Sequence, residues 1–192
     1  MSTDLPGDGS DRTEWLIRYQ PWLHYLARRE IDSRFLGKYS ASDAVQQTLL
    51  EAWKNWDQFR GTEETQRLAW LRKILAHQLA YLARHFAGTK KRDVKREVSI
   101  EQSMTTSSDR LAAILPANDS SPSFVAQRNE QTLELAAILQ QLPDDYRQVI
   151  ELRHLDQLSH PEIAKQMGRS EAAVRMLWVR ALAKLRQAAG EA

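Results

Sequence analysis

The residues of this chain that could do chemistry are mostly basic, and they gather in two places. The net charge is +5 between Arg84 and Arg96 and +4 between Arg169 and Arg186, whereas the whole 192-residue chain carries only +2. Two basic segments on an otherwise acidic chain are typical of a protein that contacts a polyanion at two points. The alternative is two solvated helix ends, and charge alone leaves the two interpretations about even.

The remaining reactive side chains form no catalytic pattern. The chain has no cysteine, which excludes disulfides, cysteine-ligated zinc and thiol chemistry. Its five histidines are scattered, and none belongs to an H-E-x-x-H motif, a phosphate-binding loop or a nucleophile motif. We therefore expect that the protein is not an enzyme and uses no metal and no cofactor.

Composition predicts an all-α protein. Glycine (7) and proline (6) are scarce, helix-forming residues dominate, and no convincing alternating strand pattern occurs. No apolar run approaches the roughly 20 residues that cross a bilayer, and the first residues lack a signal-peptide core. We expect no membrane insertion and a cytoplasmic location.

Helical periodicity divides the chain into two small helical domains joined by a flexible linker. The N-terminal domain is predicted to contain helices at about 14–30, 43–58 and 66–86, with Ser42 capping the second. The expected buried side of that second helix consists of Val45, Leu49, Ala52, Trp53 and Trp56. The Ser/Thr-rich stretch 100–123 is typical of a linker. The predicted boundaries are a disordered leader at 1–11, a domain at 12–88, the linker at 89–128 and a domain at 129–192.

The C-terminal domain is predicted to hold helices at about 124–141, 144–155, 160–167 and 171–188. Ser159 and Glu162 form a capping box at the start of the third, and Gly168 supplies the turn after it. Ser170 then caps the basic last helix. This order is typical of a helix-turn-helix, although an ordinary helical hairpin has the same features.

In the helix-turn-helix interpretation, the last helix reads bases with its N-terminal half and holds phosphates further on. The residues expected to face the groove or its rim are Arg169, Ser170, Glu171, Ala172, Arg175, Met176 and Val179, with Arg180 and Lys184 on phosphates. Trp178 is expected in the core.

The segment "LPDDYRQVIELRHLDQLSHPEIAKQMGRSEAAVRMLWVRALAKLRQ", 142–187, resembles the fourth region of bacterial sigma factors. The shared residues are Leu142, Pro143, Arg147, Val149, Leu152, Arg153, Leu158, Ser159, Glu162, Ile163, Ala164, Gly168, Ser170, Val174 and Arg175. The chain departs from the family at Leu177 and Leu182, where arginine is frequent.

The N-terminal half resembles the second region of the same family. "SDAVQQTLLEAWKNWDQFRG" places Asp43, Gln47, Trp53 and Phe59 in the family's pattern, and "WLRKILAHQLAYLARHF" resembles the segment that follows. The resemblance implies a polymerase-binding face made of Asp43, Gln46, Gln47, Leu50, Glu51 and Lys54. It also implies a minus-ten DNA-binding surface made of Arg60, Arg72, Lys73, His77, Gln78, Tyr81 and Arg84.

Two matches in the family's order identify the chain as a member of the sigma-70 family, of the extracytoplasmic-function type. The implied function is to bind core RNA polymerase, recognise minus-ten and minus-thirty-five promoter elements and promote initiation. The implied partners are core polymerase and promoter DNA, and an anti-sigma factor is a usual partner in this group. The alternative is a stand-alone helix-turn-helix regulator with a helical sensor or dimerisation domain, which would bind duplex DNA without polymerase.

Overall fold

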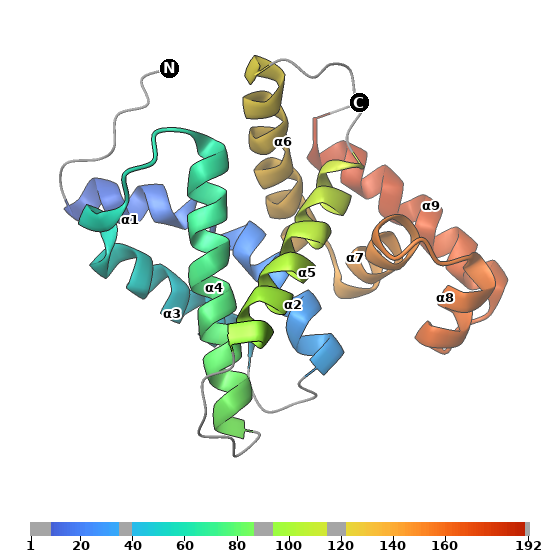
Figure 1. The fold of residues 1–192 in the computed structure, drawn as a ribbon. Coiled ribbons are helices and arrows are strands. Elements are labelled where there is room, and N and C mark those ends of the chain that lie inside the picture. The colour runs from blue at the N-terminus through green and yellow to red at the C-terminus, as the bar shows by residue number, and fades with distance from the viewer. Residues whose placement is uncertain (1–8, 35–39, 87–93, 115–121, 191–192) are drawn as a thin grey trace.

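The computed structural model describes residues 9–34, 40–86, 94–114 and 122–190 (Figure 1). These residues are helical or belong to short connections, and no strand occurs among them, as the all-α prediction requires. The α-helices are α1 (Gly9–Ile17), α2 (Gln20–Arg34), α3 (Ala41–Lys54), α4 (Glu64–Phe86), α5 (Val94–Ala112), α6 (Pro122–Gln141), α7 (Asp144–Ile150), α8 (His160–Met167) and α9 (Glu171–Ala188). A 3₁₀ turn, η1 (Trp56–Gln58), follows α3, and a π-helical turn, η2 (Glu151–Leu155), follows α7.

Helices α1 to α4 form the N-terminal group, and three details differ from the sequence prediction. Residues 9–11, which were predicted to belong to the leader, are helical, because α1 begins at Gly9. The predicted helix 14–30 is divided into α1 and α2 at a turn over Arg18 and Tyr19. The cap of α3 is Ser40, not Ser42, because the Ser40 hydroxyl oxygen accepts a hydrogen bond from the Asp43 amide at 3.1 Å. The predicted end of the third helix at Gly88 lies outside the described residues.

Helix α5 replaces part of the predicted flexible linker. Its Ile100, Met104 and Leu111 are fully buried, and they recur at helical spacing on one face. Two serines share that face. The Trp22 indole donates to the Ser108 hydroxyl oxygen at 3.3 Å, and the Tyr25 hydroxyl donates to the Ser107 carbonyl at 3.1 Å. The Ser/Thr composition that predicted a linker therefore conceals a buried helix face.

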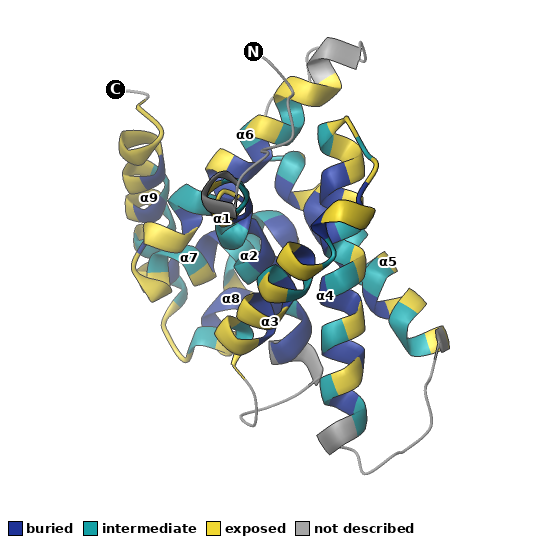
Figure 2. Cartoon of the chain, turned by 90° about the vertical axis from the view of Figure 1, so that its left-hand side faces the viewer, coloured by how far each residue is buried: buried dark blue, intermediate teal, exposed yellow. Residues whose placement is uncertain are grey.

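Helices α7, α8 and α9 with η2 form the C-terminal group. Together with α6, which precedes them, they correspond to the four predicted helical segments. Helix α9 packs on α7 and α8, while α6 lies against α2 and α5 (Figure 1). One cluster of buried apolar side chains continues from α1 to α9, so the two groups share a core in this arrangement. Figure 2 colours the buried residues of these helices dark blue.

Two arginines of α2 connect the groups electrostatically. Arg28 contacts Glu151 at 3.2 Å, and Arg29 forms an ion pair with Asp156. All four side chains are less than a third exposed. They line a polar cavity of about 370 Å³ together with Gln148, Leu152 and Gln166. We call these two ion pairs the interdomain clasp.

None of the described helices is long and apolar enough to cross a membrane.

Candidate nucleic-acid and polymerase interfaces

The turn between α8 and α9 has the geometry of a helix-turn-helix. Gly168 ends α8 with φ 63° and ψ 34°, a left-handed conformation that favours glycine. The Ser170 hydroxyl oxygen accepts from the Ala173 amide at 3.2 Å and so caps α9. At the start of α8 the Ser159 amide and hydroxyl both donate to the Glu162 carboxylate, at 2.8 and 2.5 Å. These hydrogen bonds lower the pKa of Glu162, and they confirm the predicted capping box.

The buried side of α9 is narrow. Val174, Ala181 and Leu185 are buried, and Leu177 and Leu182 are half-buried against the same core. The two leucines therefore contribute to packing at the positions where the family often has arginine. The other side of the helix presents the predicted base-facing residues to solvent, except Glu171, which is half-buried.

Two acidic side chains hold arginines of the α9 surface in place. Arg169 forms an ion pair with Asp145 of α7, and Arg175 forms one with Glu171 one helical turn earlier. Arg180 and Lys184 are exposed further along the helix, and the Lys184 ammonium donates to the Gln187 side chain at 3.1 Å. The surface of α9 outside the core is thus predominantly basic.

The predicted minus-ten residues of α4 divide into exposed and engaged groups. Lys73, His77 and Tyr81 are exposed, and Gln78 is half-buried. Arg72, also predicted to belong to the minus-ten surface, is half-buried, and its guanidinium lies 5.9 Å from the centre of the Trp22 ring. Burial lowers the pKa of Arg72, against the opposing effect of Asp109 and Glu101 on α5.

Glu97 of α5 lies against this α4 surface. Its carboxylate contacts the Arg84 guanidinium at 3.3 Å and the His77 ring nitrogen at 3.6 Å. Arg84 also stacks on Tyr81, with its guanidinium carbon 5.8 Å from the ring centre. In this arrangement an acidic side chain occupies the part of α4 that the sequence assigns to DNA.

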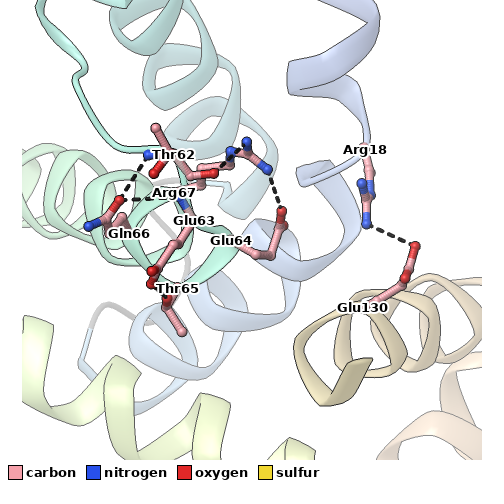
Figure 3. A network of polar contacts seen from close by, with 8 residues as sticks. All are labelled: Arg18, Thr62, Glu63, Glu64, Thr65, Gln66, Arg67 and Glu130. Carbon is pink, nitrogen blue, oxygen red and sulfur yellow. Dashed lines mark hydrogen bonds and ion pairs between the residues drawn. The ribbon is translucent and has the colours of Figure 1, made fainter. Parts of the chain in front are cut away.

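Side chains from the first turn of α4 form hydrogen bonds with the loop before this helix (Figure 3). The Gln66 side-chain oxygen accepts from the amides of Thr62 and Glu63 at 2.9 and 3.2 Å. The Arg67 guanidinium donates to the Thr62 carbonyl and to Glu64, both at 3.0 Å. These contacts satisfy free polar groups at the start of the helix and order the loop that carries the exposed Arg60.

Gly61 in the same loop is required by close packing. A Cβ atom there would lie 2.4 Å from the edge of the Phe59 ring. Phe59 in turn stacks on Trp70, with ring centres 4.8 Å apart and planes inclined by 26°. The loop and the first turns of α4 are therefore held by an aromatic pair.

Helix α3 presents the predicted polymerase-binding residues on its outer side. Asp43, Gln46, Gln47, Leu50 and Lys54 are exposed, and Glu51 is half-buried. Trp53 was expected in the core, but the structure leaves it 45% exposed. The buried residues Ala44, Val45, Thr48 and Ala52 fill the space between α3 and its neighbours, and Trp53 points away from that row. We call Asp43, Gln46, Gln47, Leu50 and Trp53 the α3 face.

The spacing of the α3 face gave a signal that the sequence interpretation missed. Gln46, Leu50 and Trp53 follow one another at intervals of four and three residues, which places Trp53 on the outer surface. Leu50 is also 45% exposed, so two large apolar side chains lie together among polar ones.

Within the part of the chain described here, no group of three or more acidic or histidine side chains is placed to hold a metal ion.

Comparisons with known proteins place both groups in one family. Residues 16–87 match the family model described as "Sigma-70 region 2", and residues 132–185 match "Sigma-70, region 4". The two matches lie within the predicted domains 12–88 and 129–192. A comparison with curated proteins gives no significant match.

Two solved structures are similar at low identity. The sigma factor RpoE, in complex with the anti-sigma factor NepR from Bartonella quintana, shares 22% identity over 94% of this chain and 98% of that one, with a TM-score of 0.33. The flagellar Sigma-28/FlgM complex shares 16% identity over 93% and 95%, with a TM-score of 0.32. Both TM-scores are low, so the assignment rests on the two family matches.

The fold and the turn geometry define an all-helical transcription factor with a C-terminal helix-turn-helix. The chain belongs to the sigma-70 family of bacterial RNA polymerase sigma factors, in its extracytoplasmic-function group. It is a sigma factor for transcription initiation, with core RNA polymerase and promoter DNA as partners. The alternative of a stand-alone regulator is not favoured.

Proposed function

We propose that three surfaces divide the work of this sigma factor. The α3 face binds core polymerase, the α4 surface with Arg60 binds the minus-ten element, and the outer side of α9 reads the minus-thirty-five element. The protein performs no covalent chemistry in this scheme and acts in the cytoplasm, where polymerase and DNA are found. The proposal is supported by the presence, in one chain, of an exposed apolar patch on α3 and a basic helix-turn-helix.

The α3 face supports protein binding more strongly than DNA binding. Trp53 and Leu50 are each 45% exposed, and aromatic residues flanked by apolar ones dominate the energetics of protein interfaces. Asp43 and the two glutamines beside them bring hydrogen-bonding groups, and Lys54 is the one cation among the predicted residues of this side of α3. A protein partner is therefore the better match for this face.

We expect Trp53→Ala to weaken the binding of core polymerase by about 2 kcal/mol, roughly thirtyfold, the scale of an interface hot spot. Surface plasmon resonance with immobilised core polymerase measures this change. Val125→Ala, which truncates an exposed residue of α6, is the control and should bind normally. Unchanged binding of the Trp53→Ala protein would assign the polymerase contact to another surface.

The α4 surface is suited to an unwound strand. Lys73 supplies a positive charge for the backbone, Tyr81 is a 53% exposed ring for stacking, and His77 and Gln78 supply hydrogen-bonding groups. Glu97 must leave Arg84 before that arginine binds a phosphate. Arg72 packs on the Trp22 ring, so we assign it a role in supporting α4 and no direct contact with DNA.

The diameter of the folded chain is smaller than the distance between the two promoter elements. Elements centred near minus ten and minus thirty-five are separated by about 25 base pairs, or about 85 Å at 3.4 Å each. A compact chain of this length has a radius of gyration of about 16 Å and a diameter of about 40 Å. The α4 surface and α9 therefore reach both elements only after the interdomain clasp opens.

We further propose that an anti-sigma factor binds the compact form. The two similar structures are complexes of a sigma factor with an anti-sigma factor, which motivates this assignment. Co-purification from cells with a tagged chain tests it, and recovery of polymerase subunits alone would contradict it.

The test of the proposed function is transcription in vitro with purified core polymerase and a pool of genomic promoter fragments. We expect start sites that depend on both core polymerase and this chain. Tight binding of an operator by the chain alone, with no association with polymerase, would instead identify a stand-alone regulator.

A further inference from the structure

The outer side of α9 carries an apolar ridge in the middle of its basic surface. Ala172, Met176 and Val179 follow one another at intervals of four and three residues, so they lie in one line along the helix. Met176 is 54% exposed and Val179 is 53% exposed. Figure 2 shows exposed residues along much of α9.

This ridge does not serve the packing of the helix. The buried residues Val174, Ala181 and Leu185 fill the inner side of α9, and the half-buried Leu177 flanks them. Neither Met176 nor Val179 belongs to the apolar cluster or to the partly buried residues packed on it. Two large apolar side chains therefore lie next to each other on the solvent side of α9, outside the packed core.

The charges beside the ridge select its partner. Arg175 and Arg180 are the chain neighbours of Met176 and Val179, and Lys184 follows on the same helix. A polyanion satisfies the cations, and the apolar side chains need an apolar group carried by that polyanion. In the major groove of duplex DNA, the apolar group at the base edges is the C5-methyl of thymine.

We propose that Met176 and Val179 read thymine methyl groups in the minus-thirty-five element. The inference rests on the proposed function, in which α9 enters the major groove. Three residues of helix rise about 4.5 Å, close to the 3.4 Å between base pairs, so the two side chains reach neighbouring pairs. The ridge thus selects two neighbouring thymines, on either strand.

The two side chains differ in how strictly they select. Valine is β-branched and restricted at χ1, so its methyl groups have a fixed position. Methionine has three rotatable bonds and adapts to irregular surfaces. The thymine opposite Val179 is accordingly required at one position, and the thymine opposite Met176 tolerates a shift by one base pair.

The first part of the test identifies the bound sequence. Holoenzyme reconstituted from core polymerase and the full chain selects duplexes from a promoter library randomised over six upstream positions. We expect enrichment of thymine at two neighbouring positions. Enrichment without a thymine requirement overturns the inference and leaves the proposed function intact, whereas no enrichment of any sequence overturns both.

The second part removes single methyl groups. Each thymine of the selected element is replaced in turn by deoxyuridine, which lacks only the C5-methyl. Each of the two replacements should weaken holoenzyme binding about fourfold, the effect of burying one methyl group. Replacement of other thymines in the element should have no effect, and equal binding of all duplexes overturns the inference.

The third part assigns the methyl groups to side chains. Val179→Ala should bind thymine and deoxyuridine duplexes equally at one position, and Met176→Ala should do so at the neighbouring one. Val125→Ala makes the same truncation as Val179→Ala on the exposed surface of α6, and it should keep the fourfold difference. Persistence of that difference in the Met176→Ala and Val179→Ala double variant overturns the inference. So does a loss of polymerase affinity in the double variant without loss of methyl discrimination, because the ridge would then be a protein contact.

Discussion

Trp178 of α9 lies between two histidines, His154 of η2 and His160 at the start of α8. Its indole donates a hydrogen bond to the His154 ring nitrogen at 3.3 Å, and the two rings are stacked with centres 6.1 Å apart. His160 meets the same indole edge-on at 5.7 Å. The His154 nitrogen accepts this hydrogen bond only when it carries no proton. This hydrogen bond between α9 and η2 therefore requires the neutral form of His154.

We expect the pKa of His154 to lie below the ordinary histidine value of about 6.5. Burial lowers the pKa of His154 and the positive charge of Arg153 lowers it further, so the unfolded chain binds a proton more readily than the folded one. The contribution of His154 to the free energy of unfolding is complete above about pH 6.5. It is lost as the pH falls through the pKa that His154 has in the folded protein. NMR titration of the His154 ring protons measures the midpoint.

The matched variants for this prediction are Trp178→Phe and His154→Gln. Trp178→Phe removes the indole donor and should raise the midpoint of His154 toward 6.5. His154→Gln removes the titration, so thermal melts between about pH 5 and 8 should show a smaller loss of stability in acid than those of the unchanged chain. A His154 midpoint at or above 6.5 in the unchanged protein would contradict the prediction.

At the scale of the elements, the helix ends decide where the functional surfaces begin. Ser40, Ser159 and Ser170 each cap the helix that follows, and Gly168 determines the angle at which α9 leaves α8. Each cap satisfies an amide that has no partner within its own helix. The positions of the α3 face and of the α9 surface follow from these local hydrogen bonds.

Ser170→Ala should lower the free energy of unfolding by about 1 kcal/mol, because it removes the side-chain acceptor for the Ala173 amide. Urea denaturation followed by circular dichroism measures the change. Ser170→Asp retains an acceptor and should recover most of the stability. Equal destabilisation by both substitutions would show that Ser170 has a role other than capping.

At the scale of the whole molecule, the interdomain clasp and α5 hold the two family regions together. Burial raises the pKa of Glu151 although Arg28 and Arg29 lie beside it. The desolvation of the Glu151 carboxylate therefore offsets part of the free energy gained from its ion pair. The net contribution of the clasp to the compact form is thus modest. A modest clasp is suited to a protein whose domains separate on the promoter.

The double variant Glu151→Gln and Asp156→Asn should open the free protein. Small-angle scattering should give a larger radius of gyration than for the unchanged chain, because both ion pairs to α2 are lost. Promoter DNA that carries both elements should bind the variant more tightly, since a larger fraction of molecules already has the open form. Asp144→Asn, which breaks only the pair with Arg147 within α7, is the control for charge removal. An unchanged radius of gyration in the double variant would assign the closure to α5 and the shared apolar core.

The sequence alone determined the features that depend on local chemistry. The capping box, the Gly168 turn, the basic last helix and the all-α class follow from residue types at short spacing, and the structure or the family comparisons confirm them. The family assignment likewise came from motifs that are contiguous in the chain. The proposed site residues stay predictions.

Only the tertiary structure decided the features that depend on distant neighbours. Trp53 lies at helical spacing from both Leu49 and Leu50, so the spacing fits either side of the helix, and only the packing of α3 leaves Trp53 exposed. The composition of 100–123 suggested a linker, yet one face of α5 is buried, and there the Ser108 hydroxyl and the Ser107 carbonyl accept hydrogen bonds from Trp22 and Tyr25. The contact of Glu97 with Arg84 joins α5 to α4. A polar side chain is stable in a core only when folding brings it a partner, and a sequence does not display that partner.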